Sequence, residues 1–238
     1  MIQPLLRSFA RVKTRVTTHE GAQQISQFPT NPISPTSGHC IRPPLGLGLS
    51  IVATIVMMWI VASEDVRTIA ACGVYCLTLI LLYGASTLSH TFHDLERRRL
   101  FRMIDQACIY LLIAGSFTPF AVIILGHGWW WSILVAMWVL AFAGVVLVLR
   151  LRNLSGAAKI TYGLLGWLPV VSLWELYQRA PAEMLMWLLA GGFFYSSGTI
   201  FLRLDQKVRY LHALWHVFVI AGSICHYIAV LVYVVGGH

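Results

Sequence analysis

The sequence predicts an all-α membrane protein, a polytopic bundle of seven transmembrane helices. Three observations carry this prediction: an apolar composition, seven apolar runs of membrane-spanning length, and positive charge confined to alternate connections. Hydrophobic residues make up 58% of the 238 residues and charged residues only 11%, whereas a soluble domain is roughly 25% charged. A globular core of this size cannot bury so much apolar surface, but a lipid bilayer can cover it.

Seven apolar runs follow a tail that has none, and each is close to the length that a bilayer requires. Helices are expected throughout, because an uncharged run in lipid must satisfy its backbone hydrogen bonds internally. The fifth run is short and is broken by Gly163, Gly166 and Pro169. The runs are Leu45–Ser63, Ile69–Leu88, Gln106–Leu125, Trp130–Leu149, Ile160–Leu176, Met184–Phe201 and His212–Val235.

The chain is expected to divide into an irregular, basic and proline-rich cytoplasmic tail, residues 1–44, and a transmembrane domain, residues 45–238. Fifteen of the 17 Lys and Arg residues lie in the tail or in the second–third, fourth–fifth and sixth–seventh connections. Only Arg67 and Arg179 lie on the other side. Because connections rich in Lys and Arg stay in the cytoplasm, the N-terminus is predicted to be cytoplasmic and the C-terminus outside.

The partner implied by this distribution is the lipid bilayer. The basic residues form no single patch, so nucleic acid is not expected as a partner. Trp129, Trp130 and Trp131 fit an aromatic belt at the outer interface of the membrane.

Five polar side chains are predicted to converge at the cytoplasmic ends of three spans. Ser86 and His90 close the second span, Asp105 opens the third, and His212 and His216 open the seventh. Residues four apart lie on one face of a helix, so each pair presents both side chains together. Ionisable residues within spans are the first candidates for function.

This set of side chains predicts a zinc site. Catalytic zinc usually has three protein ligands and a water, and the metal ligands would be His90, His212 and His216. Asp105 and Ser86 are the predicted catalytic residues. Asp105 would hold or deprotonate the water, whose pKa zinc lowers to about 7. Imidazole and carboxylate also suit other transition metals.

Each of these residues also has an ordinary structural interpretation. The histidines could be interfacial, Asp105 could complement the positive end of its helix, and Ser86 could bond to a carbonyl of its own helix. His226 lies ten residues beyond His216, which is about 15 Å deeper, and is predicted to be a buried hydrogen-bonding residue. No role is predicted for His127 or for three other histidines, namely His19, His39 and His238.

The motifs resemble the hemolysin III family over about residues 45–235, and that family belongs to the progestin and adipoQ receptor superfamily of seven-helix membrane proteins. The resemblance rests on Ser86–His90, on Asp105 leading into Ala114–Pro119, and on His212–His216 followed by Gly222 and His226. It implies a cytoplasmic-side zinc ion on the three histidines, with Asp105 and Ser86 at the site. It further implies a multi-pass protein of the bacterial inner membrane that is linked to membrane-lipid homeostasis.

Three functions follow as hypotheses. The first is a zinc-dependent, ceramidase-like hydrolase that acts on a lipid amide or ester. The second is a pore-forming or cytolytic protein, although the third to sixth spans carry few polar residues and no intramembrane charge pairs, whereas an aqueous path needs a polar lining. The third is a non-catalytic sensor in which zinc is structural. The sequence leaves the substrate, the ion and the oligomeric state open.

Overall fold

The computed structural model describes residues 42–92, 94–151, 156–204 and 211–236. The predicted tail lies outside the described residues up to residue 41. The described helices belong to one packing unit, His39–His238, and no strand occurs among the described residues. The helices are α3 (Arg42–Ile60), α4 (Val66–Thr91), α5 (Leu95–Pro119), α6 (Trp130–Leu151), α7 (Gly156–Trp167), α8 (Leu173–Arg179), α9 (Ala182–Leu204) and α10 (Leu211–Ile228).

Four short helical segments extend these helices. Two are 3₁₀ turns, η1 (Val61–Ser63) and η3 (Leu168–Ser172), and two are π-helical, η2 (Phe120–Ile124) and η4 (Ala229–Val235). Segment η2 begins directly after Pro119, which has no N–H to donate to the helical ladder.

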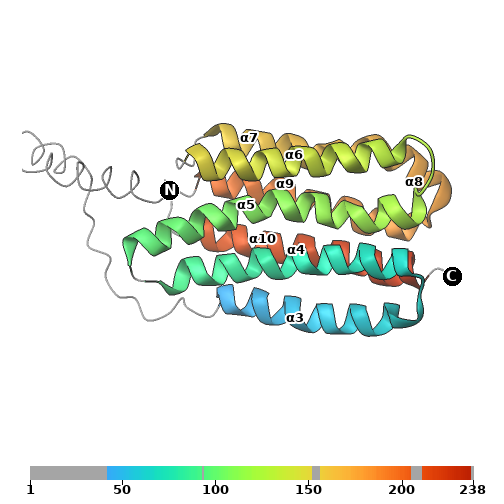
Figure 1. Cartoon of the computed structure of the whole chain (residues 1–238), viewed down its shortest axis with the longest axis horizontal. Coiled ribbons are helices and arrows are strands. Elements are labelled where there is room, and N and C mark those ends of the chain that lie inside the picture. The colour runs from blue at the N-terminus through green and yellow to red at the C-terminus, as the bar shows by residue number, and fades with distance from the viewer. Residues whose placement is uncertain (1–41, 93, 152–155, 205–210, 237–238) are drawn as a thin grey trace, which may run out of the picture. The chain divides into compact units, whose positions relative to one another are not determined.

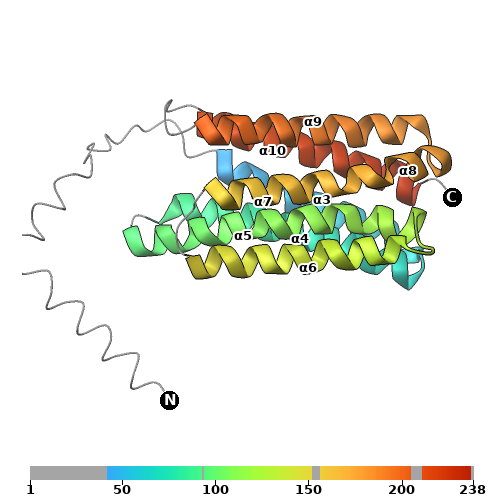
Figure 2. The same cartoon turned by 90° about the horizontal axis from the view of Figure 1, so that it is seen from above.

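The described elements are all helical and include six candidate membrane spans, which confirms the predicted class of all-α polytopic membrane protein. Six of the described helices are long and apolar enough to span a membrane: Leu45–Ser63, Val66–Thr91, Glu96–Ile124, Trp130–Arg150, Ala182–Leu202 and Ala213–Val235. The predicted fifth run is not among these six, and α7, η3 and α8 form it in succession along the bundle (Figure 2). Its 3₁₀ turn contains Pro169, so the predicted break in this run has a direct structural counterpart.

The helices pack side by side in a closed arrangement (Figure 1). Helix α3 contacts α4, α4 contacts α5, α5 contacts α6, and α6 contacts α7. Helix α7 contacts α9, α9 packs against α10, and α10 contacts α3. Helix α5 is the most enclosed of the candidate spans, and α3 is among the least enclosed. Large apolar side chains such as Trp59, Val139 and Phe193 are exposed on the outside of the bundle, as expected for surfaces that lipid covers.

Local sequence explains where several helices begin. Asp65 accepts a hydrogen bond from the Thr68 backbone N–H at 2.8 Å and so caps α4. Asp94 caps α5 in the same way through the Arg97 N–H, at 3.3 Å. Helix α3 begins at Arg42, so Pro43 and Pro44, which the sequence analysis places in the tail, lie in its first turn, where proline is tolerated.

The two ends of the bundle differ in chemistry. The end where α4 passes to α5 carries Arg97, Arg98 and Arg99 and is called the basic end. The opposite end, where α5 passes to α6, carries Trp129, Trp130 and Trp131 and is called the tryptophan end. Gly128, between them and α5, has a positive φ of 58°, which favours glycine. The basic end is the end that the charge distribution predicts to face the cytoplasm.

Candidate metal centre

Two of the three predicted metal ligands meet at the basic end. His90 lies in the last turn of α4, and His216 lies in the second turn of α10. The centroids of their imidazole rings are 5.4 Å apart and the ring planes are inclined by 74°. His90 is exposed and His216 is half-buried, so the pair is open to water or to a ligand on one side.

This separation fits two ligands of one ion. Zinc binds imidazole nitrogen at about 2.0 Å with tetrahedral angles, so two rings that share one zinc ion have centroids about 5 Å apart. The 5.4 Å between His90 and His216 is close to that value. The distance between the two rings is therefore compatible with a shared metal ion.

The third predicted ligand, His212, opens α10 one turn before His216, and its side chain lies outside the described residues. Among the side chains that are described, no group of three His, Cys, Asp or Glu residues is arranged to hold a metal ion. The three-histidine site thus stays a prediction, of which the His90–His216 pair is the described part.

Ser86 lies one turn inside His90 on α4 and is 4% exposed. Its hydroxyl oxygen is buried and has no hydrogen-bond partner among the described residues. It does not bond to its own helix, in contrast to Ser89, whose hydroxyl donates to the Ser86 carbonyl at 2.8 Å. A buried hydroxyl without a partner is uncommon and calls for a specific explanation, and the ordinary structural interpretation of Ser86 does not supply one.

Asp105 lies in the third turn of α5 and is half-buried. It is close enough to Arg102 and Cys108, each three residues away on its own helix, to interact with them electrostatically. It does not join His90 and His216 in a three-residue metal group of the described side chains. The role predicted for Asp105, which is to hold or deprotonate a water at the site, stays a prediction.

His226 differs in part from its prediction. Its two ring nitrogens are buried as expected, but neither makes a hydrogen bond of normal geometry within the described residues. The ring packs edge-on against Tyr195, with centroids 5.3 Å apart. A Cβ atom at Gly191 would collide with it. Packing between α9 and α10 encloses the ring, and the Leu188 backbone lies close enough to interact with it.

A hydroxyl network inside the bundle has no counterpart in the sequence analysis. The Tyr83 hydroxyl donates to the Ser223 hydroxyl at 2.8 Å, and the Tyr195 hydroxyl bonds to the same oxygen at 2.9 Å. The Tyr75 hydroxyl donates to the Ser223 carbonyl at 3.3 Å. Ser223 thereby joins α4, α9 and α10. Tyr75 and Tyr83 are eight residues apart on one helix face, a spacing that hints at this network in the sequence.

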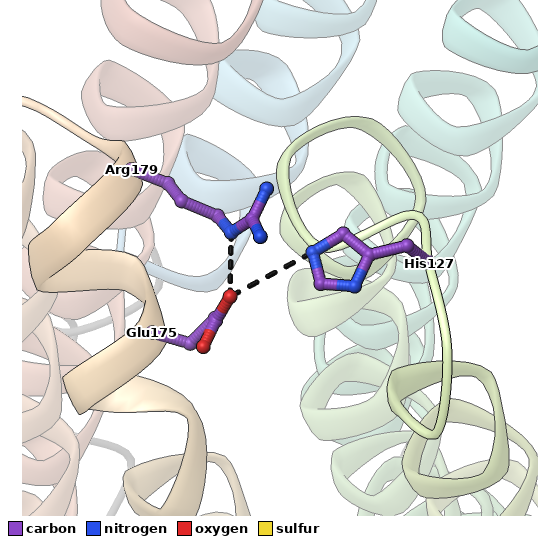
Figure 3. Close-up of polar contacts among 3 residues, drawn as sticks. All are labelled: His127, Glu175 and Arg179. Atoms are coloured by element: carbon purple, nitrogen blue, oxygen red, sulfur yellow. Dashed lines mark hydrogen bonds and ion pairs between the residues drawn. The ribbon is translucent and has the colours of Figure 1, made fainter.

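A second polar cluster lies at the tryptophan end. Glu175 on α8 accepts a hydrogen bond from Arg179 Nε at 2.6 Å, and His127 Nε2 lies 3.7 Å from the same carboxylate oxygen (Figure 3). His127 precedes α6, so the cluster links the connection between α5 and α6 to helix α8. The sequence analysis predicts no role for His127, because this contact depends on the fold of the fifth crossing.

Comparison with known proteins agrees with this architecture. The model of the family described as haemolysin-III related matches residues 43–227. Hemolysin-3 of Bacillus cereus is 38% identical over 82% of this chain and 90% of its own length. The hemolysin-3 homolog of Bacillus subtilis is 32% identical over 83% of this chain and 93% of its own length. The human monocyte to macrophage differentiation factor is 25% identical over 72% of this chain and 73% of its own length.

The family match covers α3 to α10 up to Tyr227 and includes every predicted site residue. The more distant similarity to animal proteins extends to the adiponectin receptor protein of Drosophila melanogaster, which is 26% identical over 65% of this chain and 40% of its own length. Multi-pass topology, motif order and these similarities lead to one conclusion: the chain belongs to the haemolysin-III related family of membrane proteins.

Proposed function

We propose that this protein is a zinc-dependent, membrane-embedded hydrolase of a lipid amide or ester, linked to membrane-lipid homeostasis. The observation that carries the proposal is the His90–His216 pair at the basic end, whose spacing of 5.4 Å suits one shared ion. When bound in an open site, zinc polarises a carbonyl and lowers the pKa of water to about 7. His212, four residues before His216 on α10, would be the third ligand.

The two predicted catalytic residues have side chains that suit such a reaction. Asp105 would accept a proton from a water near the histidines, which is the role of a general base. The buried Ser86 hydroxyl, which has no partner among the described residues, would hydrogen-bond to the carbonyl oxygen or to the water. Satisfying a buried polar group in this way orients the reacting group at little cost.

A small cavity supports a lipid as the substrate. It holds about 120 Å³ between α3, α4 and α10 and is lined largely by apolar side chains, with Tyr83 and Ser223 among them. Tyr83 lies three residues before Ser86 on the same helix, so the cavity and Ser86 lie on one face of α4. An alkyl chain in this cavity would reach it from the bilayer and would place its polar group towards Ser86.

The proposed location is the bacterial inner membrane, with the basic end in the cytoplasm. The similarity to hemolysin-3 proteins of two Bacillus species supports a bacterial membrane, and the charge distribution supports the orientation. The pore-forming and structural-zinc alternatives stay hypotheses. A structural zinc site is closed to water, and the exposure of His90 favours an open one.

Metal analysis of the purified protein tests the zinc part of the proposal. We expect about one zinc ion per chain in the parent and a large loss in His90→Ala and His216→Ala. His127→Ala, at the opposite end of the bundle, is the matched control and is expected to keep its zinc. Stoichiometric zinc that persists in both His90→Ala and His216→Ala would contradict the site.

Lipid analysis tests the reaction. In a deletion strain, the substrate amide or ester is expected to accumulate, the parent gene is expected to reverse this, and His216→Ala is expected not to. A protein that binds zinc while the deletion leaves all lipid amides and esters unchanged would instead be a sensor with structural zinc. Dye release from liposomes by the pure protein, absent after heat inactivation, would favour the pore-forming alternative.

A further inference from the structure

A second cavity lies at the tryptophan end, opposite the proposed metal site. It holds about 390 Å³, within the range of small-ligand sites, and three parts of the chain form its wall. These are η2, the end of α8 with its connection to α9, and η4. The lining residues are Ile123, Ile124, Arg179, Ala180, Pro181, Tyr233 and Val234.

Both π-helical segments of the described chain wall this cavity. Ile123 and Ile124 belong to η2, and Tyr233 and Val234 belong to η4. A π-helical turn is rare and is found often at functional sites, because it distorts the regular ladder of hydrogen bonds. Two such turns that face one cavity therefore mark this place in the bundle as a candidate binding site.

Arg179 brings unused hydrogen-bond donors to the cavity. Its Nε donates to Glu175 at 2.6 Å, which fixes the plane of the guanidinium. Its two terminal nitrogens point away from Glu175 (Figure 3) and have no partner among the described residues. A guanidinium presented in this way matches the two oxygens of a phosphate or a carboxylate.

The charge balance favours an amphiphile over a free anion. Glu175 offsets the charge of Arg179, and its carboxylate also faces His127 at 3.7 Å. The Glu175–Arg179 pair has no net charge, so its long-range attraction for an inorganic anion is weak. Ile123, Ile124 and Val234 offer apolar contacts beside the guanidinium, and only a ligand with an alkyl chain uses both.

The depth of the cavity matches that of a lipid headgroup. His127 lies just before Trp129 in the chain, and Arg179 lies near His127 because both contact Glu175. Trp129 and Trp131 are exposed, and exposed tryptophans mark the membrane interface. We propose that Arg179 and the cavity between η2, η4 and the α8–α9 connection bind the anionic headgroup of a bilayer lipid, with the start of its acyl chain against Ile123, Ile124 and Val234.

Native mass spectrometry of the full chain, exchanged into phosphatidylcholine with a small fraction of phosphatidylglycerol, tests this proposal. The parent is expected to retain one phosphatidylglycerol per chain in preference to phosphatidylcholine. Arg179→Gln is expected to weaken this retention at least about tenfold. Arg67→Gln is the matched control, because Arg67 lies on the same side of the membrane by the charge count but lines neither described cavity, and it is expected to behave as the parent.

Further variants keep the test decisive. Arg179→Gln leaves Glu175 without its partner, so the double variant Glu175→Gln/Arg179→Gln restores neutrality and is expected to fold and still lose retention. Equal retention by the parent and the double variant would overturn the proposal. Displacement of the lipid by millimolar inorganic phosphate would assign the site to a soluble oxyanion and overturn the lipid assignment. All variants are expected to keep their zinc. Lipid retention therefore tests this proposal, zinc content tests the proposed function, and either can be contradicted without the other.

Discussion

His90 and His216 face one another between α4 and α10, with ring centroids 5.4 Å apart. Neither helix alone could form this pair, and a bound ion would tie the two helices together at the basic end. Binding to the folded state alone stabilises a protein in proportion to the logarithm of ligand concentration, by about 2.7 kcal/mol at one hundred times the Kd. Metal occupancy at this pair should therefore be visible in stability.

Removal of the metal is predicted to lower the thermal unfolding midpoint of the parent in detergent. A chelator is expected to shift this midpoint by several degrees, and added zinc is expected to restore it. His216→Ala is expected to show the lower midpoint from the start and no response to the chelator. A parent midpoint that does not respond to chelator, in a preparation that has lost its metal, would contradict a link between α4 and α10 through the ion.

Ser86→Ala is predicted to separate activity from stability. The Ser86 hydroxyl is buried without a described partner, so its removal is expected to leave the free energy of unfolding unchanged or to raise it by up to about 1 kcal/mol. Lipid hydrolysis is expected to fall, because the substrate or water would lose a hydrogen bond. Ser89→Ala, also buried on α4 but bonded to a carbonyl, serves as the control and should keep full activity.

Filling the cavity of about 120 Å³ is predicted to block the substrate chain without disturbing the metal. Ala53 lines this cavity from α3, and Ala53→Phe is expected to reduce lipid turnover while the zinc content stays at the parent level. Val52→Phe is the matched control, because Val52 is exposed on the neighbouring position of α3. Equal turnover in the two variants would place the substrate elsewhere.

Loss of the Tyr83 hydroxyl is predicted to weaken the contact between α4 and α10. Tyr83→Phe removes the donor to Ser223 at 2.8 Å, and hydrogen bonds between membrane helices contribute about 0.6 to 1.7 kcal/mol each. Unfolding in mixed micelles should show a loss of this size. Tyr177→Phe, at an exposed position of α8, is expected to have no effect. The double variant Tyr83→Phe/Ser223→Ala should lose less free energy of unfolding than the sum of the two single losses, because both substitutions remove the same hydrogen bond.

Two adjacent glycines of α9 are predicted to respond in opposite ways to alanine. A Cβ atom at Gly191 would collide with the His226 ring, whereas a Cβ atom at Gly192 would meet nothing within 4 Å. Gly191→Ala is expected to destabilise the protein by about 1 to 3 kcal/mol. Gly192→Ala is expected to be neutral or stabilising by up to about 1 kcal/mol. The same destabilisation in both variants would argue against close packing of α9 on His226.

Much of the fold could be predicted from the sequence, because lipid imposes strong local rules. An apolar run must be helical, its length must match the bilayer, and Lys and Arg mark the cytoplasmic side. The spans, the break at Pro169 and the helix face shared by Ser86 and His90 follow from such rules. These rules do not predict which faces of two separate spans contact each other, since that depends on how each helix is rotated against its neighbours.

Contacts between elements that are distant in the chain decided the rest. The contact of His90 with His216, the hydroxyls of Tyr83 and Tyr195 on one serine, and the contact of His127 with Glu175 all join residues far apart in the chain. The seven helices and the basic side with its histidines were thus determined by the sequence. The tertiary structure decided which of these side chains meet, because glycine contacts and ring packing set the rotation of each helix, and hydropathy does not encode it.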